Sequence, residues 1–575
     1  MARRTPPPPP LPPQTLARRA TAKPDPRPIL LAEKRDVEGV RVILSAYGLR
    51  DLDQADRNLN AMAGDPIQRR RLADSLPLLM ESISRTADPD QALNHWERIL
   101  GSVSRTSFLD YLRDWPRMLD LLCVIFGNSD ALTFTLLRDP TLVYWLAEEN
   151  VSSKPPTRKG MERALRESIG HLTTKELKLD ALRRFQRREM LRIGVRDLLR
   201  LATVPETTSS LSDLACLMIH ATYEIVDADL KRQYGVPMHR NKRGQWCETQ
   251  FAVIGMGKLG GHELNYSSDV DLLYIYESDD GETRAQGPRR ADQPAGVGIS
   301  NEEYFEILSR ELTRVLTEPT REGHVFRVDL RLRAEGSIGQ LARSLSSYQR
   351  YYLARGQTWE RLALLKAYPI AGSPELGTAF VKGVKPFIFG VGKKLPDLTE
   401  TSAVIEEVRA VKDMIDGKMA DRGHEHRNVK LGTGGIREIE FFVQTLQVLA
   451  GKQLPAVVDK STLGALERFA RWKLISTQVK EDLTAAYLFL RDVEHKLQMI
   501  HDLQTHSLPS DERELERCAA RMGYGTEDRK KAVALFLDDH QRHTTVVHRI
   551  FQSLFLEPKI SPALGATFRA RKAKR

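Results

Sequence analysis

Two aspartates at the start of an apolar strand, just behind a glycine-rich turn, most strongly constrain what this chain can fold into. The segment QFAVIGMGKLGGHELNYSSDVDLLYIYE, residues 250–277, carries Asp269 and Asp271. Residues i and i+2 of a strand point to the same face, so both carboxylates can reach one site while Val270 and Leu272 pack behind them. This spacing is typical of a place where metal ions are held against a nucleotide.

A third carboxylate, Asp329, lies in the later strand-like run VFRVDLRLR, residues 325–333. Three carboxylates from two strands can hold a pair of Mg²⁺ ions beside a phosphate, as in polymerases and nucleotidyltransferases. We therefore predict that Asp269, Asp271 and Asp329 are the catalytic, metal-binding residues and that Mg²⁺ is the cofactor, in the form of two ions.

The same run predicts a cationic surface around the third carboxylate. By the period-two rule, Arg327, Asp329, Arg331 and Arg333 share one face of the strand. Guanidinium groups are suited to bidentate phosphate contacts, so Arg331 and Arg333 are candidate phosphate-binding residues. The alternative is an exposed, charged edge strand with internal ion pairs.

The glycines of the turn imitate another nucleotide-binding motif. Gly255, Gly257 and Gly260 spell G-x-G-x-x-G, the dinucleotide-binding fingerprint. Only residues 261–266 separate the last glycine from the polar cluster that opens the next strand, whereas a parallel crossover needs at least about 10 to 12 residues. The pattern is also no Walker A loop, because no Ser or Thr follows Lys258. The spacing favours a nucleotidyltransferase over a dinucleotide-binding fold.

The turn supplies further candidate contacts for nucleotide and phosphate. A backbone amide can approach a phosphate closely where no side chain intervenes, which favours Gly257 and the glycines that extend the turn. The candidate nucleotide- and phosphate-binding residues of this segment are Gly257, Lys258, Gly260, Gly261 and Ser268.

Several blocks of the chain resemble a known family. GMGKLGGHELNYSSDVDLLYIYE, VFRVDLRLRAEGSIGQL, TWERLALLKAYPIAG, KLGTGGIREIEFFVQTLQ and VEHKLQMIHDLQTHSLP follow one another between about residues 180 and 510. They are similar to blocks of the glutamine synthetase adenylyltransferase/adenylyl-removing enzymes, members of the polymerase-β-like nucleotidyltransferase superfamily. The resemblance also implies that the third metal-binding carboxylate is Asp329.

The resemblance implies a function and partners. The family's bifunctional enzyme has two nucleotidyltransferase halves, and FRVDLRLR, WERLALLKA and GGIREIEF are similar to the first half, which removes AMP from glutamine synthetase. The implied reaction is phosphorolysis of the adenylylated tyrosine to give ADP, in the regulation of nitrogen metabolism. The implied partners are glutamine synthetase, ATP or ADP, phosphate and a PII-type signalling protein.

Three alternatives to this function remain open at the level of sequence. The same site could run ATP-dependent adenylylation of the same tyrosine. A nucleotidyltransferase acting on small molecules shares the carboxylate pattern but usually comes in a much smaller chain. A non-catalytic module that binds glutamine synthetase or a PII-type protein would keep the helical blocks but has no reason to keep all three acids.

Charge and composition argue against nucleic-acid and membrane partners. The net charge is +11, but residues 1–30 contribute +5 and residues 569–575 another +5, which leaves about +1 for the body. A polymerase working on nucleic acid needs a basic groove in its folded part. No apolar run reaches the roughly 18 to 20 residues of a membrane span, and the four cysteines show no metal or disulfide spacing. We expect a cytoplasmic protein.

The predicted fold class is α+β, a polymerase-β-like nucleotidyltransferase module embedded in a mainly helical protein. The predicted parts are a disordered Pro/Arg-rich tail over 1–30, a helical region over 31–235, the catalytic module over 236–375, a helical bundle over 395–560 and a basic tail over 561–575. Within the module, Ser300 is predicted to cap a helix that runs through Leu316.

Two features of the C-terminal region allow both a structural and a binding interpretation. Gly432, Gly434 and Gly435 precede an apolar-faced helix, whose first amides could receive an anion or simply start a helix. The histidine groups lack zinc-binding spacing, so solvated or core histidines are favoured over a metal site; these are His424, His426, His495, His501 and His506.

Overall fold

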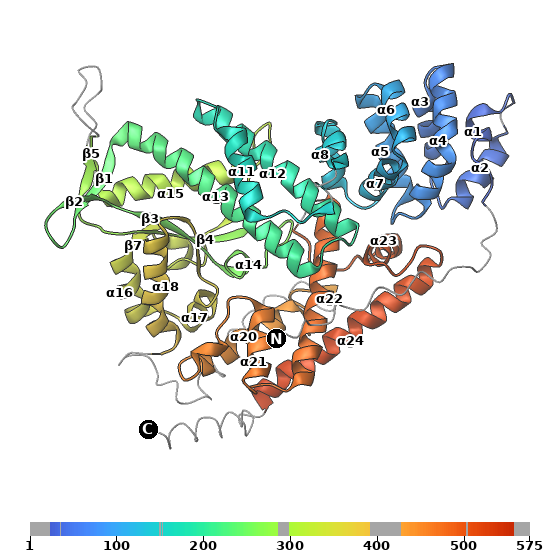
Figure 1. The fold of residues 1–575 in the computed structure, drawn as a ribbon. Helices are drawn as coiled ribbons and strands as arrows, with labels where there is room; N and C mark the ends of the chain where they lie inside the picture. The colour runs from blue at the N-terminus through green and yellow to red at the C-terminus, as the bar shows by residue number, and fades with distance from the viewer. Residues whose placement is uncertain are drawn as a thin grey trace, which may run out of the picture. The chain divides into compact units, whose positions relative to one another are not determined.

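A computed structural model describes residues 23–34, 36–148, 151, 153–285, 298–390, 427–501 and 504–556. The chain divides into two compact units, Met1–Gly127 and Asn128–Arg575, which are described separately (Figure 1). Predictions for most of the N-terminal tail, the centre of the polar insertion between the second strand and the Ser300 helix, His424, His426 and the C-terminal tail lie outside the described residues.

The first unit is helical. Aspartates that precede its helices accept hydrogen bonds from first-turn amides, as Asp36, Asp51, Asp65 and Asp88 do. Its helices are α1 (Pro28–Leu31), α2 (Val37–Ala46), α3 (Leu52–Ala63), α4 (Pro66–Ser84), α5 (Pro89–Ser102), α6 (Arg105–Asp114) and α7 (Pro116–Phe126).

The tail expected over residues 1–30 ends earlier than predicted. Ile29 and Leu30 of α1 are buried, and the Tyr47 hydroxyl donates to the Pro24 carbonyl at 3.0 Å. The apolar sequence Pro-Ile-Leu-Leu explains the difference, because it buries enough surface to order a segment that composition alone marks as a tail.

A deletion experiment follows from this boundary. Removing residues 1–22 and 569–575 is expected to change the rate of any reaction at the predicted carboxylates less than about twofold, because neither segment carries a candidate site residue. Removing residues 1–30 is expected to lower the thermal midpoint as well, since it takes away the buried Ile29 and Leu30. The measurement is a side-by-side rate and melting curve of both truncated proteins. A large rate loss in the shorter deletion would show that a tail contributes to substrate binding.

The second unit begins with helices that lead into the sheet. They are α8 (Asp130–Arg138), α9 (Leu142–Ala147), α11 (Arg158–Ile169), α12 (Lys175–Leu198) and α13 (Val204–Tyr234). Thr203 and Glu206 form a capping box at the start of α13, which ends at Gly235 with a φ of 88°. The helical region predicted over 31–235 is thus shared between two compact units.

The central sheet has the strand order β6-β4-β3-β8, with β7 also paired to β4. Its strands are β3 (Phe251–Gly255), β4 (Val270–Tyr276), β6 (Val328–Asp329), β7 (Ala342–Ser344) and β8 (Tyr368–Gly372). The strands β3 and β4 run antiparallel, so no parallel crossover follows the glycines. The rejection of a dinucleotide-binding motif is confirmed.

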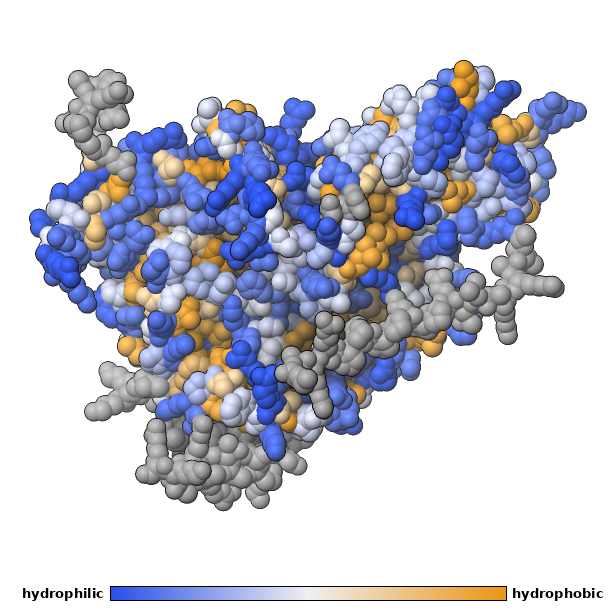
Figure 2. Space-filling model, in the orientation of Figure 1, coloured by the Kyte–Doolittle hydropathy of each residue, from blue (hydrophilic) through white to orange (hydrophobic). Residues whose placement is uncertain are grey.

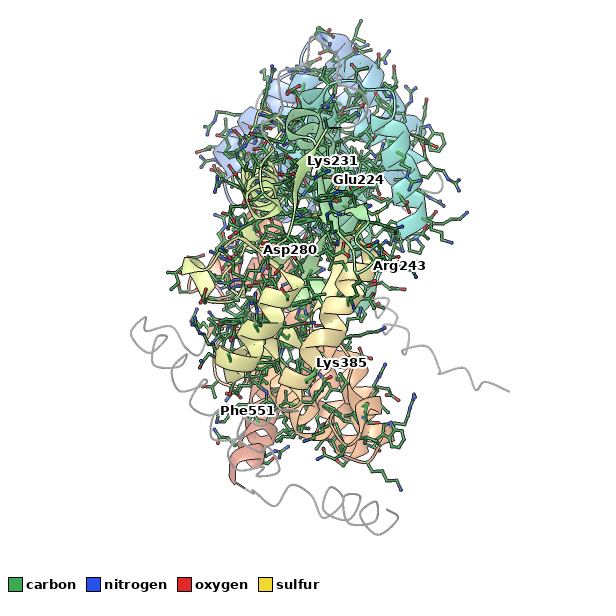
Figure 3. All side chains as sticks on the ribbon, turned by 90° about the vertical axis from the view of Figure 1, so that its left-hand side faces the viewer. Glu224, Lys231, Arg243, Asp280, Lys385 and Phe551 are labelled. Atoms are coloured by element: carbon green, nitrogen blue, oxygen red, sulfur yellow. The ribbon has the colours of Figure 1, made fainter. Side chains whose placement is uncertain are left out.

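A second, smaller sheet is formed by strands that flank β3 and β4 in the sequence. It is formed by β1 (Val236–Arg240), β2 (Trp246–Glu248) and β5 (Glu282–Arg284), in the order β2-β1-β5. Lys231 of α13 bonds to Glu248 of β2 at 2.6 Å and so ties this sheet to the helix (Figure 3).

Helices cover both faces of the central sheet. On one face, Phe251 of β3 stacks on Tyr223 of α13 and on Phe305 of α15 (Asn301–Thr317). On the other face, Ile254 and Ile275 belong to a core that includes residues of α16 (Leu345–Arg355), α17 (Thr358–Leu364) and α18 (Pro374–Ile388) (Figure 1). The sequence Ser300-x-x-Glu303 predicts a capping box, and its first half is present: the Ser300 hydroxyl accepts from the Glu303 amide at 3.1 Å, whereas within the described residues the Ser300 amide makes no return bond to the Glu303 side chain.

The C-terminal part returns to helix. After the module, whose turn between β3 and β4 contains the short α14 (Gly257–Gly260), the helices are α20 (Ile436–Ala450), α21 (Thr462–Arg471), α22 (Thr477–His501), α23 (Glu512–Met522) and α24 (Arg529–Leu556). Their apolar sides form one core around residues such as Ile439, Phe469, Leu490 and Phe536. A mixed sheet between helices inside a mainly helical chain confirms the predicted α+β class.

The surface and helix lengths bear on the membrane question. No helix in the described part of the chain is both long and apolar enough to span a bilayer. The face drawn in Figure 2 is largely hydrophilic, with apolar residues in small groups.

Candidate active site

The sheet register brings the three predicted carboxylates together. The strands β4 and β6 are parallel, and Asp271 is directly opposite Asp329. Asp269 immediately precedes β4, two residues from Asp271 and on the same face of the chain. Asp329 follows Asp271 by 58 positions and Asp269 by 60 positions in the sequence. The pairing of two residues of β4 with two of β6 brings the three carboxylates to one edge of the sheet.

The strand that carries Asp329 is shorter than predicted. It covers Val328–Asp329, after which the chain turns: the Arg331 amide donates to Asp329 Oδ1 at 2.8 Å and the Arg333 amide to the Leu330 carbonyl at 3.2 Å. The expectation of one continuous face from Arg327 to Arg333 is therefore wrong. The alternation of charged and apolar residues in this run does not distinguish a strand from a turn, because in a turn the arginines can donate to nearby carboxylate and carbonyl oxygens.

The arginines compensate two of the three carboxylates. Arg327 Nε lies 2.9 Å from Asp269 Oδ1, and Arg331 Nη2 lies 2.6 Å from Asp329 Oδ2. Burial alone would raise the pKa of Asp329, but hydrogen bonds from Arg331 outweigh it and hold that pKa below its usual value. These are the internal ion pairs that the alternative interpretation of the run expected.

Asp271 is in a different electrostatic state. Burial raises the pKa of Asp271 to about 7, and repulsion from Asp329 and Asp269 adds to the effect. Its carboxylate has no ion-pair or hydrogen-bond partner among the described residues. A half-buried carboxylate beside two others is where a divalent cation relieves the most repulsion.

The donor set is consistent with Mg²⁺, although the side chains are not arranged around an ion. Asp269 and Asp329 are turned toward their arginines, and within the described residues no three His, Cys, Asp or Glu side chains converge as metal ligands. Carboxylate oxygens are the ligands that Mg²⁺ prefers, and the uncompensated Asp271 lies between the other two. The residues fit the group.

The glycines of the turn serve close packing. Gly257 has a φ of 53°, and a Cβ there would collide with the Asp271 carboxylate. A Cβ on Gly260 would collide with the Lys366 carbonyl, and one on Gly261 would lie 2.9 Å from Glu263 Oε2. Only Gly257 therefore borders the carboxylates; Gly260 and Gly261 border the segments that support the turn.

The remaining candidates, Lys258, Arg333 and Ser268, also differ in whether other parts of the protein already bind their polar groups. Lys258 Nζ lies 2.9 and 3.0 Å from the two carboxylate oxygens of Glu494 on α22. Arg333 is buried and donates to the carbonyls of Leu330, Ser337 and Gly339 at 2.8 to 3.1 Å. Ser268 is half-buried beside Asp269. The first two are held by the protein itself, whereas the Ser268 hydroxyl has no partner among the described residues.

A buried charge network joins the module to the C-terminal helices, and the sequence analysis did not identify it. Lys366 Nζ lies 2.8 Å from Glu263 and 3.3 Å from Glu440 of α20. Glu494 accepts from Lys258 and lies 2.9 Å from His506 Nδ1. No local signal in the run Glu494-His495-Lys496 marks these charges as buried, because Glu and Lys are exposed in most proteins.

The glycines before α20 form an ordinary helix start. The first amides of the helix, those of Ile436, Arg437 and Glu438, donate to the carbonyls of Val429, Lys430 and Gly435 at 3.0, 3.0 and 3.1 Å. These donors are already used, so of the two interpretations the ordinary helix start is the one that the structure supports. The buried Ile436, Ile439, Val443 and Leu446 confirm the predicted apolar side.

The buried histidines have structural partners. His495 is fully buried, and its Nε2 lies 3.0 Å from Asn265 Oδ1. Burial, reinforced by the charges of Arg491 and Lys496, holds the pKa of His495 well below 6.5. This histidine is neutral in the folded protein near pH 7.

The depressed pKa predicts acid sensitivity. Below about pH 6.5 the unfolded chain binds a proton at His495 that the folded chain does not, so stability falls as pH falls, at about 1.4 kcal/mol per pH unit. The thermal midpoint should therefore drop less between pH 7 and 5.5 in His495→Gln than in the wild type. His171→Gln, at an exposed site, is the control and should follow the wild type. Parallel curves for all three proteins would contradict the assignment.

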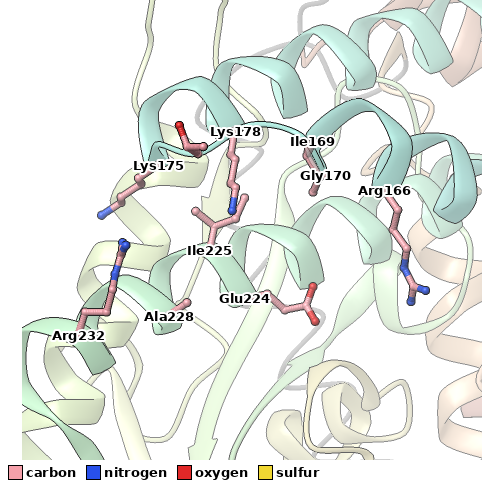
Figure 4. Close-up of a pocket in the computed structure, with 10 residues that line it drawn as sticks. Arg166, Ile169, Gly170, Lys175, Lys178, Glu224, Ile225, Ala228 and Arg232 are labelled. Carbon is pink, nitrogen blue, oxygen red and sulfur yellow. The ribbon is translucent and has the colours of Figure 1, made fainter. Parts of the chain in front are cut away.

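Two cavities lie away from the carboxylates. One, of about 560 Å³, lies among α11, α12 and α13 (Figure 4), lined by residues that include Arg166, Lys175, Lys178 and Arg232. Another, of about 210 Å³, is lined by Gly261, His262 and Glu263 of the module and by Tyr487 and Arg491 of α22. None of the three candidate carboxylates lines either cavity.

The antiparallel strand pair behind a glycine turn, with carboxylates on two adjacent strands, defines a nucleotidyltransferase module of the polymerase-β type. Residues 119–383 match the sequence model of glutamate-ammonia ligase adenylyltransferases. Over these residues, which are somewhat less than half of the chain, the sequence is similar to this family of nucleotidyltransferases. Residues 409–555 match a second model, described as GlnD PII-uridylyltransferase.

Curated relatives carry one name, bifunctional glutamine synthetase adenylyltransferase/adenylyl-removing enzyme. The protein of Nitrosococcus oceani is 36% identical over 442 residues, which are 77% of this chain and 43% of that protein. The protein of Rhizobium meliloti is 39% identical over 67% of this chain and 37% of its own length. That of Streptomyces coelicolor is 32% identical over 86% and 46%. The chain thus spans less than half the length of these relatives.

Proposed function

We propose that this protein removes AMP from an adenylylated tyrosine of glutamine synthetase by phosphorolysis, and so takes part in the regulation of nitrogen metabolism. The observation that carries the proposal is the β4–β6 register, which sets Asp271 opposite Asp329 with Asp269 two residues away. The names of the relatives, which include both adenylyltransferase and adenylyl-removing activity, support the substrate.

The reaction is an in-line displacement at the phosphorus of the AMP group. A phosphate oxygen attacks, a new P–O–P bond forms, the bond to the tyrosine oxygen breaks, and that oxygen takes up a proton as ADP is released. A pair of Mg²⁺ ions, held by Asp269, Asp271 and Asp329, would neutralise charge on the entering and leaving oxygens.

The chain's own residues hold the reactants. Arg327 and Arg331 lie against the outer carboxylates and can turn their guanidinium groups to phosphate oxygens once a cation takes their place. Arg331 is the more exposed of the two, with 78% of its side chain exposed against 40% for Arg327. The Ser268 hydroxyl is a third contact for phosphate, and Gly257 lets the turn approach the Asp271 carboxylate.

The direction of transfer is tested by product analysis. Adenylylated glutamine synthetase, incubated with the protein, Mg²⁺ and phosphate, is expected to yield ADP and unmodified tyrosine. Unmodified synthetase with ATP should give little AMP-tyrosine. Mass spectrometry of nucleotide and synthetase distinguishes the two. Efficient AMP-tyrosine formation, with no phosphate-dependent ADP, would establish the reverse activity instead.

A small-molecule nucleotidyltransferase is the second candidate, favoured by the generality of the carboxylate arrangement. Screening for AMP transfer from ATP to small hydroxyl acceptors separates it from the first. A non-catalytic module is disfavoured, because the half-buried Asp271 carboxylate has no ion-pair partner among the described residues and lies beside two other carboxylates, which has no structural benefit.

The C-terminal helices are the proposed receiver for a PII-type signalling protein, on the basis of the second sequence match over residues 409–555. The expected result is a change in the rate of ADP formation when a PII-type protein from the same organism is added. No change in rate and no co-elution in gel filtration would exclude this role.

A further inference from the structure

The turn between β3 and β4 contacts Asp271 through both its backbone and its side chain. The Met256 amide donates to the Asp271 carbonyl at 2.9 Å. Gly257, with a φ of 53°, packs so closely on the Asp271 carboxylate that an added Cβ would collide with it. A displacement of the turn would therefore open space beside this carboxylate and allow it to adopt other rotamers.

The turn is held together by its own backbone hydrogen bonds. The Gly260 amide donates to the Met256 carbonyl at 2.9 Å, and the Gly261 amide donates to the Gly257 carbonyl at 3.1 Å. Lys258 lies inside this single helical turn, directly after the glycine that borders the carboxylate. Whatever holds Lys258 in place therefore also holds Gly257 in place.

The residue that holds Lys258 is Glu494 of α22. Both carboxylate oxygens of Glu494 lie 2.9 and 3.0 Å from Lys258 Nζ, and the two side chains are 0% and 11% exposed. Glu494 is fixed in turn by two further cationic side chains, since His506 Nδ1 lies 2.9 Å and Arg491 Nε 3.4 Å from its oxygens. A buried carboxylate with three such neighbours is a rigid anchor for the turn.

The second ion pair of the network acts elsewhere. Lys366 contacts Glu263 at 2.8 Å, beyond the end of the helical turn, and Glu440 at 3.3 Å. Gly260, which packs on the Lys366 carbonyl, does not border the carboxylates. The contact of Lys258 with Glu494 is thus the one that connects α22 to Asp271 through Gly257.

We propose that Glu494 is a positioning residue for the carboxylate site: through Lys258 it holds the glycine turn against Asp271 and so sets the orientation in which that carboxylate accepts a divalent cation. Helix α22 lies within residues 409–555, the segment that matches the PII-uridylyltransferase model. The C-terminal helices then complete the metal site without contributing a ligand. The inference deepens the proposed function and rests on it for the presence of the metal.

Titration of the full chain with Mn²⁺ tests this role without any substrate. Mn²⁺ takes the same oxygen ligands as Mg²⁺, and electron paramagnetic resonance follows its free form. The double variant Lys258→Met/Glu494→Gln removes both charges of the pair, so neither partner stays buried as an unpaired ion. We expect it to melt near the wild-type midpoint but to bind Mn²⁺ about 10-fold more weakly, the lower end of what outer partners of metal ligands contribute. Lys258→Arg should retain most of the affinity.

The matched control removes another ion pair of the same unit. Lys175 of α12 lies 2.9 Å from Glu311 of α15, with side chains 17% and 22% exposed, and no contact joins this pair to the glycine turn among the described residues. The double variant Lys175→Met/Glu311→Gln should bind Mn²⁺ as the wild type does. All titrations are run well below the lowest melting midpoint, so that a loss of affinity cannot come from unfolding.

The outcomes separate this inference from the proposed function. A Mn²⁺ affinity of the folded Lys258→Met/Glu494→Gln variant within twofold of the wild type overturns the role of Glu494, as does an equal loss in the control or a wild type that binds no Mn²⁺. If the double variant does not fold, Lys258→Met alone decides by the same criteria, because Glu494 then keeps Arg491 and His506 as neighbours. Weakened binding supports the inference even if adenylylated glutamine synthetase and phosphate yield no ADP; the proposed reaction then fails while the positioning role stands.

Discussion

Asp271→Asn is expected to abolish turnover and at the same time to raise the thermal midpoint of the metal-free protein. The loss should be at least about 100-fold, since even outer partners of metal ligands are worth roughly 10- to 100-fold. The gain follows from the raised pKa, about 7, of the buried Asp271 carboxyl. Protonation of such a group contributes to stability fully below its unfolded pKa of about 3.9, and that contribution is lost as pH rises through 7. Asparagine cannot ionise, so the variant lacks the free-energy cost of holding an ionised carboxylate at this position.

The measurement is a rate with Mg²⁺ and a melting curve at pH 8 in the presence of a chelator, where the midpoint should rise by about 2 °C or more. Asp329→Asn is the matched contrast. It should lose activity too, but it should not be stabilised, because Arg331 already holds the pKa of Asp329 below its usual value. Near wild-type activity in Asp271→Asn would refute the metal-site assignment. Equal midpoint shifts in the two variants would refute the electrostatic difference.

The parts of the site that sequence predicted depend on local rules. The i, i+2 rule placed Asp269 and Asp271 on one face, and loop length alone excluded a parallel crossover after Gly260. The resemblance to a family supplied the third carboxylate, and the register of two short parallel strands then accounts for its position opposite Asp271.

The errors arose where tertiary contacts override a local pattern. Period-two alternation extended the third strand to Arg333, but carbonyl groups of a turn capture that guanidinium. Glycine turns suggested phosphate contacts at Gly260 and before α20, yet backbone packing and an ordinary helix start use those positions. Such partners come from segments distant in sequence, which no local rule can identify.

The least predictable feature is the pairing of charges between module and C-terminal helices. Lys258, Glu263 and Lys366 read as turn and helix residues, and their partners Glu440 and Glu494 lie 74 to 236 positions away. Only three-dimensional proximity shows that these charges are buried together. The same proximity shows that Lys258, which the sequence suggested as a phosphate ligand, is bound by Glu494 of α22.

Lys366→Met is expected to destabilise the second unit by about 3 to 5 kcal/mol, because it leaves buried carboxylates without their cation. Lys366 Nζ lies 2.8 Å from Glu263 and 3.3 Å from Glu440, and the side chains of Lys366 and Glu263 are each 7% exposed. Glu263 also accepts from the Thr462 amide at 2.6 Å, so it cannot leave the site without breaking the start of α21. Urea unfolding followed by circular dichroism measures the change.

A double-mutant cycle shows whether the loss comes from unpaired charge rather than from lost packing. Glu263→Gln keeps the shape and its hydrogen bond to Thr462 while removing one charge. Combined with Lys366→Met, it should restore part of the stability, because fewer carboxylates then lack a counter-ion. Lys385→Met, on the exposed side of α18 (Figure 3), is the control and should change stability by no more than about 0.5 kcal/mol. Additive effects in the double mutant would mean that Lys366 stabilises the unit mainly by packing, and the network would then be a consequence of the fold rather than one of the interactions that join the module to the C-terminal helices.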